Sequence, residues 1–143
     1  MRKYLMIIVI VMCTILFPVE AKAVEMDIEE EVLIQQIALA EAGSQGIGGM
    51  AFVMQTIENR VESSSFPDTV YEVITQEGQF ATYSSGIYKN FSPNKNSQQA
   101  LELLTILENQ GQLYFENPGG ETSTWHSRNL EFVFEYRDHV FYK

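Results

Sequence analysis

The chain has 143 residues and a formal net charge of −10, with 19 acidic and 9 basic side chains. So acidic a protein lacks the basic surface that binds nucleic acid, and anionic lipids repel it. Two histidines and a single cysteine leave few ligands for a metal site.

The first 23 residues have the pattern of a secretory signal peptide. Two basic residues precede an apolar run from Tyr4 to Phe17, and Ala21-Lys22-Ala23 offers a small-residue cleavage site. An uncleaved anchor is the alternative, but an apolar run that spans a bilayer needs about 20 residues. Attachment of a lipid at Cys13 is disfavoured by the residues around it. We therefore expect export and cleavage after Ala23.

The remaining segment, residues 24–143, is expected to form one domain with a single core. Removal of the signal peptide lowers the basic residues from 9 to 6 and the acidic residues from 19 to 18, which gives a formal charge of −12. No cysteine remains, so packing alone must hold the domain together. This composition suits an exported bacterial protein.

Helical spacing begins directly after Asp27. Asp27 is a typical N-cap, and Glu30 three residues later predicts a capping box. Apolar residues then recur at roughly helical spacing, which predicts a helix from Ile28 to Ala42 with Gly43 as its stop. Glu41 therefore lies in the last turn of this helix.

Glu41 has an unusual position for a carboxylate. The macrodipole places partial negative charge at a helix C-terminus, which should favour the protonated form of the side chain. A protonated carboxylic acid is the form that a general acid requires. The alternative, which position alone favours, is a solvated surface glutamate at a frayed helix end.

Further helices alternate with loops in the middle of the chain. Residues 43–49 are rich in glycine and predict a flexible connection, and a second helix with an apolar stripe then closes at Asn59-Arg60. A Pro-Asp turn leads to a short helix from about Thr69. Residues 75–94 contain many Gly, Ser, Tyr and Phe residues and predict a long loop, a feature that is usually functional in a compact domain.

The C-terminal third combines one more helix with strands. Ser97 is expected to cap a helix that ends at Gly111. An extended segment and a loop follow over residues 113–127, and residues 130–143 alternate well enough for a hairpin that turns at Arg137-Asp138. The expected fold class is a small, mostly helical α+β domain with a C-terminal β-hairpin.

The residues exclude several kinds of chemistry. No cysteine nucleophile survives cleavage, no Gly-x-Ser-x-Gly motif occurs, and His126 and His139 lack partners for a zinc site, so we expect no metal and no cofactor. What remains is Glu41 and a group of aromatic and hydrogen-bonding side chains of the kind that hold sugar rings. The alternative is that the aromatic residues simply fill the core. The group consists of Tyr114, Asn117, Trp125, His126, Tyr136, His139 and Tyr142.

Five short motifs occur together in one order. They are Glu41-Ala42, Asn59-Arg60, Phe66-Pro67-Asp68-Thr69-Val70, Gln76-Glu77-Gly78-Gln79-Phe80 and His139-Val140-Phe141-Tyr142. Each motif is weak alone, but the order and spacing of all five are specific. From about Val32 to Lys143, the chain resembles the SleB-like cell wall hydrolases, known from spore cortex-lytic enzymes.

The resemblance implies a lysozyme-like, transglycosylase-like fold and an enzyme that cleaves peptidoglycan glycan strands between N-acetylmuramic acid and N-acetylglucosamine at the bacterial cell wall. It implies Glu41 as the catalytic residue, which protonates the glycosidic oxygen and then takes a proton from the muramyl 6-hydroxyl to close a 1,6-anhydro ring. This lytic transglycosylase route needs one carboxylate rather than the usual pair. The residues implied to line the substrate groove are Gln79, Phe80, Tyr83, Trp125, His139 and Tyr142.

Two positions depart from the family pattern. The family commonly continues Glu-Ala with Arg-Gly-Glu, where this chain has Gly43, Ser44 and Gln45, and its glycine before the terminal motif is replaced within Tyr136-Arg137-Asp138. No peptidoglycan-binding repeat precedes the domain, so wall targeting is expected from the groove or from a protein partner. Two alternatives stay open: a muramidase that uses water, and a non-catalytic glycan-binding module.

Overall fold

In the computed structural model, which describes residues 24–143, helix α1 spans Ile28–Ala42, as its sequence predicts. Asp27 caps this helix, because its carboxylate accepts a hydrogen bond from the backbone N–H of Glu30 at 2.8 Å. The predicted capping box is wrong, since the Glu30 carboxylate accepts the N–H of Tyr71 at 2.9 Å instead. Glu30 thereby ties the start of α1 to helix α3, Val70–Thr75.

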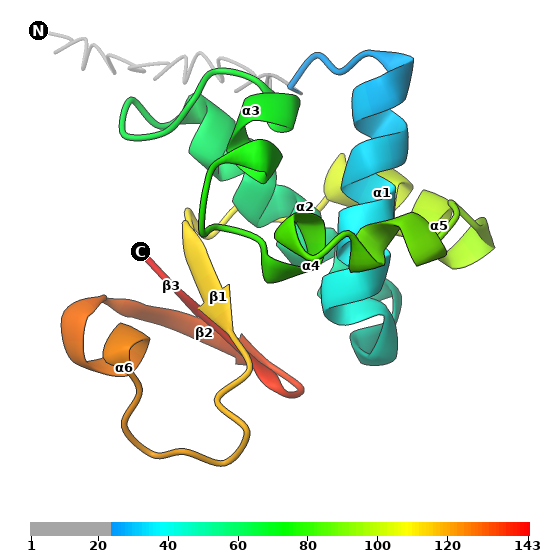
Figure 1. Cartoon of the computed structure of the whole chain (residues 1–143). Coiled ribbons are helices and arrows are strands. Elements are labelled where there is room, and N and C mark those ends of the chain that lie inside the picture. The colour runs from blue at the N-terminus through cyan, green and yellow to red at the C-terminus, as the bar shows by residue number, and fades with distance from the viewer. Residues whose placement is uncertain (1–23) are drawn as a thin grey trace, which may run out of the picture.

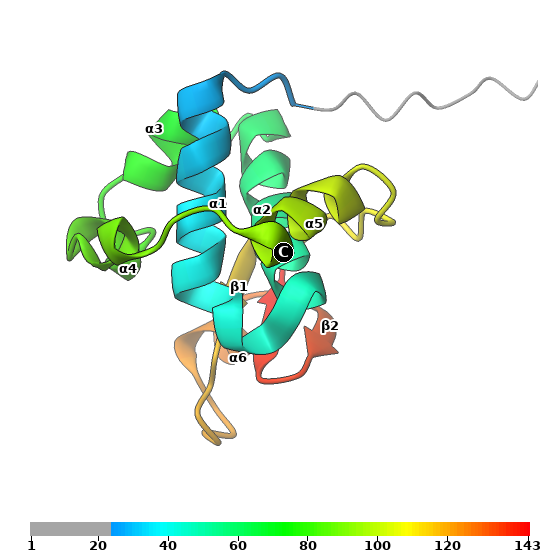
Figure 2. The ribbon, with the colours of Figure 1, turned by 90° about the vertical axis from the view of Figure 1, so that its right-hand side faces the viewer.

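The connection after α1 is a tight helical junction. A 3-10 turn, η1, spans Gly43–Gln45 and leads directly into α2, Gly46–Glu62. Gly46 makes this junction possible, since its φ of 74° is one that glycine adopts without strain. The predicted flexible connection is therefore wrong, and α1 and α2 pack against each other (Figure 2).

The region predicted as a long loop contains two short helices. α4 spans Ala81–Ser84 and the 3-10 helix η2 spans Ile87–Asn90, so the loop prediction is wrong over these residues. Local hydrogen bonds such as that from the Ser84 N–H to the Phe80 carbonyl, at 3.1 Å, close these single turns. Turns this short carry too few residues for hydrophobic periodicity to reveal them.

Helix α5 spans Lys95–Leu104, and its cap is Asn94 rather than the predicted Ser97. Ser97 is the third helical residue and completes a capping box by accepting the N–H of Asn94 at 2.9 Å. The helix ends earlier than predicted because the following chain is held to α2. There the Asn109 side chain donates to Oδ1 of Asn59 at 2.6 Å.

A three-stranded antiparallel sheet follows these helices, in the order β1-β3-β2. β2, Phe132–Tyr136, and β3, His139–Tyr142, form the predicted hairpin, and Arg137 in its turn has a φ of 52°. β1, Tyr114–Glu116, also pairs with β3, so the predicted extended segment becomes an edge strand. A short helix, α6, Trp125–Asn129, lies on the side of the sheet away from the main helices (Figure 1). The predicted mostly helical α+β class with a C-terminal hairpin is confirmed.

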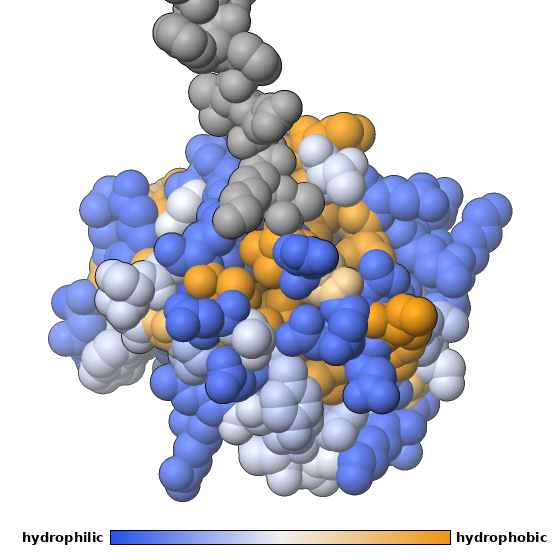
Figure 3. Space-filling view, turned by 90° about the horizontal axis from the view of Figure 1, so that it is seen from above, coloured by the Kyte–Doolittle hydropathy of each residue, from blue (hydrophilic) through white to orange (hydrophobic). Residues whose placement is uncertain are grey.

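The core lies where α1, α2, α3 and α5 meet, and apolar residues of all four helices are buried there. Phe52 on α2 extends this core to the sheet, with its ring centroid 4.8 Å from that of Phe134 and 5.7 Å from that of Phe141. Seen from above, apolar side chains reach the surface near the start of the described chain (Figure 3), where Val24 and Met26 pack against the core.

The predicted signal peptide, residues 1–23, lies outside the described residues. None of the helices between residues 24 and 143 combines the length and the apolar character that crossing a bilayer requires.

Candidate active site

Glu41 lies in the last turn of α1, as predicted, one residue before the helix ends. Its side chain is half-buried, and its Oε1 accepts a hydrogen bond from the hydroxyl of Thr82 at 2.6 Å. Thr82 belongs to α4, which packs against α1. The carboxylate is therefore held by a segment distant in sequence, unlike a solvated glutamate at a frayed helix end.

An aromatic layer connects α4 to the inner face of the sheet. Successive side chains of a strand point to opposite faces, and Phe115 on β1 points toward the helices. Its ring centroid lies 6.3 Å from that of Phe80 and 5.5 Å from that of His139. Because Phe80 immediately precedes α4, this layer extends from the sheet to the turn that holds Glu41.

Three of the residues expected to line the groove are buried. Phe80 is 2% exposed, and His139 and Tyr142 are each 4% exposed. Burial lowers the pKa of His139, against a smaller opposite effect of the Asp138 carboxylate, so the ring is neutral at neutral pH. Phe80 and His139 therefore lie in the aromatic layer between α4 and the sheet. Tyr142 lies beneath α6 instead, where its ring stacks on His126.

Gln79, Tyr83 and Trp125 keep accessible side chains, but they do not form one cluster. Gln79 and Tyr83 are partly exposed on either side of Thr82 in the chain, and the Tyr83 ring stacks on Tyr88 with centroids 5.0 Å apart. Trp125 is 57% exposed on α6. Figure 1 shows α6 apart from α4, the helix that contains Tyr83 and closely follows Gln79, so Trp125 lies apart from these two residues.

A polar cluster beneath α6 was not predicted from the sequence. The Glu116 carboxylate, at the end of β1, accepts hydrogen bonds from the hydroxyls of Thr124 and Tyr142, and its Oε2 lies 3.0 Å from Nδ1 of His126. Burial, and then the contact with Glu116, raise the pKa of the Tyr142 phenol, which keeps this hydroxyl protonated as a donor. Spacing could not predict the cluster, because its members come from β1, α6 and β3. In the part of the chain described by the structure, no group of three or more His, Cys, Asp or Glu side chains could hold a metal ion.

The two segments that depart from the family pattern contact each other through Gln45 and Asp138. Gln45 is 4% exposed, its amide donates to Oδ2 of Asp138 at 3.1 Å, and its carbonyl accepts the Asp138 N–H at 3.1 Å. A glutamate at position 45 would place a second carboxylate beside that of Asp138 and could not donate to it. The glutamine amide can both donate to the Asp138 carboxylate and accept the Asp138 N–H. Gln45 therefore joins the junction after Glu41 to the hairpin turn and is not free to contact substrate.

Glycines let the hairpin lie close against this junction. A Cβ on Gly48 would lie 2.5 Å from the hydroxyl oxygen of Tyr136, and a Cβ on Gly49 would lie 2.3 Å from Cβ of Gln45. Both distances are too short for carbon to fit without a shift of its neighbour. The stretch that the sequence predicts as flexible is thus a close-packed surface that fixes the hairpin a few residues after Glu41.

Asn59 and Arg60, the second motif, hold the segment that leads into β1. The Asn59 side chain donates to the Gln112 carbonyl at 2.8 Å, and Nε of Arg60 donates to the Leu113 carbonyl at 2.7 Å. Burial lowers the pKa of Arg60 to about 10, so it remains charged at neutral pH. Its guanidinium lies over three rings, at 5.0 Å from Phe66, 5.3 Å from Phe80 and 5.5 Å from Tyr114. The motif is therefore structural.

A surface hollow of about 450 Å³ lies at the opposite end of α1 from Glu41. The Glu30 carboxylate within it already binds the backbone of α3. Neither Glu41 nor Thr82 lines this hollow. We place the candidate active site at the C-terminal end of α1, because the Thr82 hydroxyl orients the Glu41 carboxylate there. The residues around the hollow are Asp27, Glu29, Glu30, Leu33, Gln36, Tyr71 and Tyr88.

Glu58 on α2 is a second acid to consider. Burial, and then the nearby Glu62 carboxylate, raise the pKa of Glu58 to about 7. A raised pKa can mark a general acid. However, no hydrogen bond from the described residues orients this side chain, whereas the Thr82 hydroxyl orients Glu41. The geometry therefore favours Glu41 over Glu58 as the general acid.

Replacing Glu58 with glutamine is expected to stabilise the protein at pH 8 and to leave its stability at pH 4 almost unchanged. The folded protein keeps the Glu58 proton up to about pH 7, whereas the unfolded chain loses it near pH 4.5, so the fold loses stability as the pH rises between these values. The gain at pH 8 should be about 1–2 kcal/mol, less than the full shift implies because the side chain is partly solvated. Urea denaturation at both pH values measures the effect, and an equal gain at pH 4 and pH 8 would contradict it.

One protein family and two solved structures match most of the described chain. Residues 44–142 match a protein family described as Cell Wall Hydrolase. The fold is similar to the catalytic domain of the germination-specific lytic transglycosylase SleB from Bacillus anthracis, with a TM-score of 0.71 and 25% identity over 82% of this chain and 97% of that chain. It is also similar to the catalytic domain of the Bacillus cereus SleB protein, with a TM-score of 0.64 and 26% identity over 80% of this chain and 89% of that chain. No curated protein matches the sequence.

Proposed function

Because this chain belongs to the Cell Wall Hydrolase family, we propose that it is a lytic transglycosylase that cleaves peptidoglycan glycan strands between N-acetylmuramic acid and N-acetylglucosamine. The resemblance predicted from the sequence is confirmed, as is the lysozyme-like fold class. The family match begins at Ser44, just after Glu41. The match therefore does not include Glu41, and the catalytic role proposed for Glu41 rests on its hydrogen bond with Thr82.

Glu41 acts twice in the proposed reaction. Protonated, it gives its proton to the glycosidic oxygen as the bond between that oxygen and the muramyl C1 breaks. The resulting carboxylate then takes the proton of the muramyl 6-hydroxyl, whose oxygen bonds to C1 and closes the 1,6-anhydro ring. Glu41 is protonated again at the end, and no water is consumed. The route therefore needs a single carboxylate, unlike the paired acids of ordinary glycosidases.

Thr82 suits a partner that changes its protonation state during the reaction. A hydroxyl can donate to a carboxylate and can accept from a carboxylic acid, so the contact at Oε1 can persist in both states. A donor-only side chain such as lysine would stabilise the ionised form alone. Within residues 24–143, no hydrogen bond reaches Oε2 of Glu41, which leaves that oxygen available to the substrate.

Replacing Thr82 with valine is expected to lower kcat about tenfold with little change in KM, whereas serine should retain most of the activity. Valine keeps the shape of threonine but lacks the hydroxyl that orients Glu41. Initial rates of soluble glycan release, measured over a range of substrate concentrations, give the two constants. Equal kcat values for Thr82→Val and the unmodified protein would show that Thr82 does not position Glu41.

The accessible residues beside Thr82 in the chain complete the proposed site. Gln79 can bind sugar hydroxyls through its amide, and the partly exposed ring of Tyr83 can pack against a pyranose face. The buried rings of Phe80 and His139 give this region a firm aromatic support. Gln79 and Tyr83 are therefore proposed as substrate contacts near the scissile bond. Phe80 and His139 are proposed to support them from the core without contacting the substrate.

Release of soluble fragments separates catalysis from binding. The protein is incubated with purified sacculi and, in parallel, with spore cortex fragments, and soluble glycan is measured in the supernatant. Release from both is expected, and the faster of the two identifies the preferred wall. Sedimentation of the protein with the wall and no soluble product would contradict the proposal and favour a glycan-binding module.

A further inference from the structure

Trp125 is exposed yet held in place from both sides. Its side chain is 57% exposed at the start of α6. The two residues that flank it, Thr124 and His126, both contact the Glu116 carboxylate. Thr124 also caps α6 and shares a capping box with Ser127. The indole is thus presented to solvent from a short helix whose first turn is fixed to the sheet.

Glu116 organises this arrangement from β1. Its side chain is only 14% exposed, and its Oε1 also accepts the Tyr142 hydroxyl at 3.0 Å. The His126 ring stacks on Tyr142 with centroids 5.8 Å apart and meets Trp125 edge-on at 5.5 Å. The edge contact with His126 and the fixed first turn of α6 restrict the Trp125 side chain, so it loses less conformational entropy when a ligand covers it. The cluster therefore prepares Trp125 for binding.

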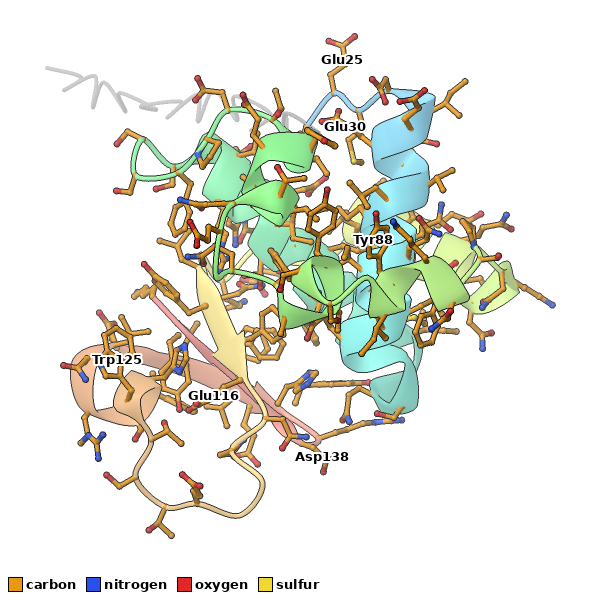
Figure 4. The ribbon with its side chains drawn as sticks, viewed as in Figure 1. Glu25, Glu30, Tyr88, Glu116, Trp125 and Asp138 are labelled. Carbon is orange, nitrogen blue, oxygen red and sulfur yellow. The ribbon has the colours of Figure 1, made fainter. Side chains whose placement is uncertain are left out.

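We propose that Glu116 is a positioning residue that fixes Trp125 as a stacking platform for a pyranose ring of the glycan strand, at a sugar contact apart from Glu41. Figure 4 shows Trp125 and Glu116 on the sheet side of the molecule. A flat, exposed indole matches the apolar face of a pyranose ring. The inference rests on the proposed function, because the ligand is the polymer that Glu41 would cleave.

Charge explains why such a contact is useful to this protein. The chain carries a formal charge of −10 and cannot rely on electrostatic attraction to hold an anionic wall polymer. Stacking on an aromatic ring does not depend on charge and tolerates the salt concentration of the cell exterior. A second contact on the same strand also raises the effective concentration of the scissile bond near Glu41.

The fluorescence of Trp125 tests this platform directly, because Trp125 is the only tryptophan in the chain. The ligand is a soluble tetrasaccharide of alternating N-acetylglucosamine and N-acetylmuramic acid, added to the Glu41→Gln protein so that no turnover occurs. Coverage of the indole should give a saturable blue shift of its emission. In the same background, Trp125→Ala should bind the tetrasaccharide about tenfold more weakly by calorimetry.

The role of Glu116 is tested by variants that remove or restore its contacts. Glu116→Ala should lower the fluorescence anisotropy of Trp125 and weaken tetrasaccharide binding. Glu116→Gln should restore both, since its carbonyl can accept from the two hydroxyls and its amide can donate to His126. Glu135→Ala, which removes an exposed carboxylate from β2, is the matched control and should behave as the unmodified residue. If Glu116→Ala does not fold, Thr124→Val removes one of the same contacts and replaces it in the test.

Each outcome bears on a separate claim. Calorimetric binding without a change in Trp125 emission, or no binding by either method, would overturn the platform. Unchanged anisotropy and affinity in Glu116→Ala and Thr124→Val would overturn the positioning role. Failure of the proposed function has a different signature: the unmodified protein would release no soluble glycan from sacculi while the fluorescence titration still saturates.

Discussion

A protein in which Glu41 is replaced by glutamine is expected to release glycan from sacculi at least about 10³-fold more slowly than the unmodified protein, and to fold normally. Glutamine has the shape of glutamate, and its carbonyl can still accept the Thr82 hydroxyl. It can neither supply a proton to the glycosidic oxygen nor remove one from the 6-hydroxyl. Initial rates of glycan release measure the loss, and thermal denaturation establishes that the fold remains.

Glu58→Gln is the matched control for this experiment. It makes the same chemical change at the acid on α2 whose pKa is raised to about 7. We expect cleavage at the unmodified rate, because nothing in the described structure orients Glu58 toward a ligand. Retained activity in Glu41→Gln together with lost activity in Glu58→Gln would transfer the general-acid role to Glu58.

Replacing Gly49 with alanine is expected to destabilise the protein by about 2 kcal/mol. The new Cβ would lie 2.3 Å from Cβ of Gln45. Gln45 cannot easily move aside, since it is buried and exchanges two hydrogen bonds with Asp138. The junction after Glu41 must therefore shift, and cleavage per folded molecule should fall as well. Urea denaturation and rates corrected for the folded fraction give the two effects.

Gly43 provides a matched control in the same junction. Its φ of −56° and ψ of −38° suit any residue, and a Cβ there would meet no atom within 4 Å. Gly43→Ala should therefore leave stability unchanged or raise it slightly. Similar losses in Gly43→Ala and Gly49→Ala would show that backbone freedom, and not close packing, is the property that the junction requires.

The longer elements could be predicted because their signals are local. Asp27 followed by a helical apolar pattern gives α1 with its correct bounds, and alternation around Arg137-Asp138 gives the hairpin. The predictions fail where tertiary contacts determine the local structure. The stretch 43–49 looks flexible from its glycines, but Gly46 provides a positive φ at the junction, and Gly48 and Gly49 allow close packing against Tyr136 and Gln45. The end of α5 is likewise set by a side-chain contact with α2.

The same distinction applies to the candidate site. Glu41 could be selected because a carboxylate at a helix C-terminus is unusual and belongs to a motif. Thr82 could not, since it lies 41 residues away in a segment that predicts only a loop. Glu116 joins residues from three elements, and no spacing in the sequence brings them together. Burial of Phe80 and His139 also depends on packing between the sheet and the helices, and burial of Tyr142 on its contacts with His126 of α6, which no single segment encodes.

The identity of the new chain ends tests the central claim most directly. Sacculi are digested with the unmodified protein, and the soluble products are examined by mass spectrometry without chemical reduction. If Glu41 closes the ring as proposed, the products end in 1,6-anhydromuramic acid and are lighter by one water than hydrolysis products. Products that carry reducing muramic acid ends would contradict the account and establish a muramidase that uses water.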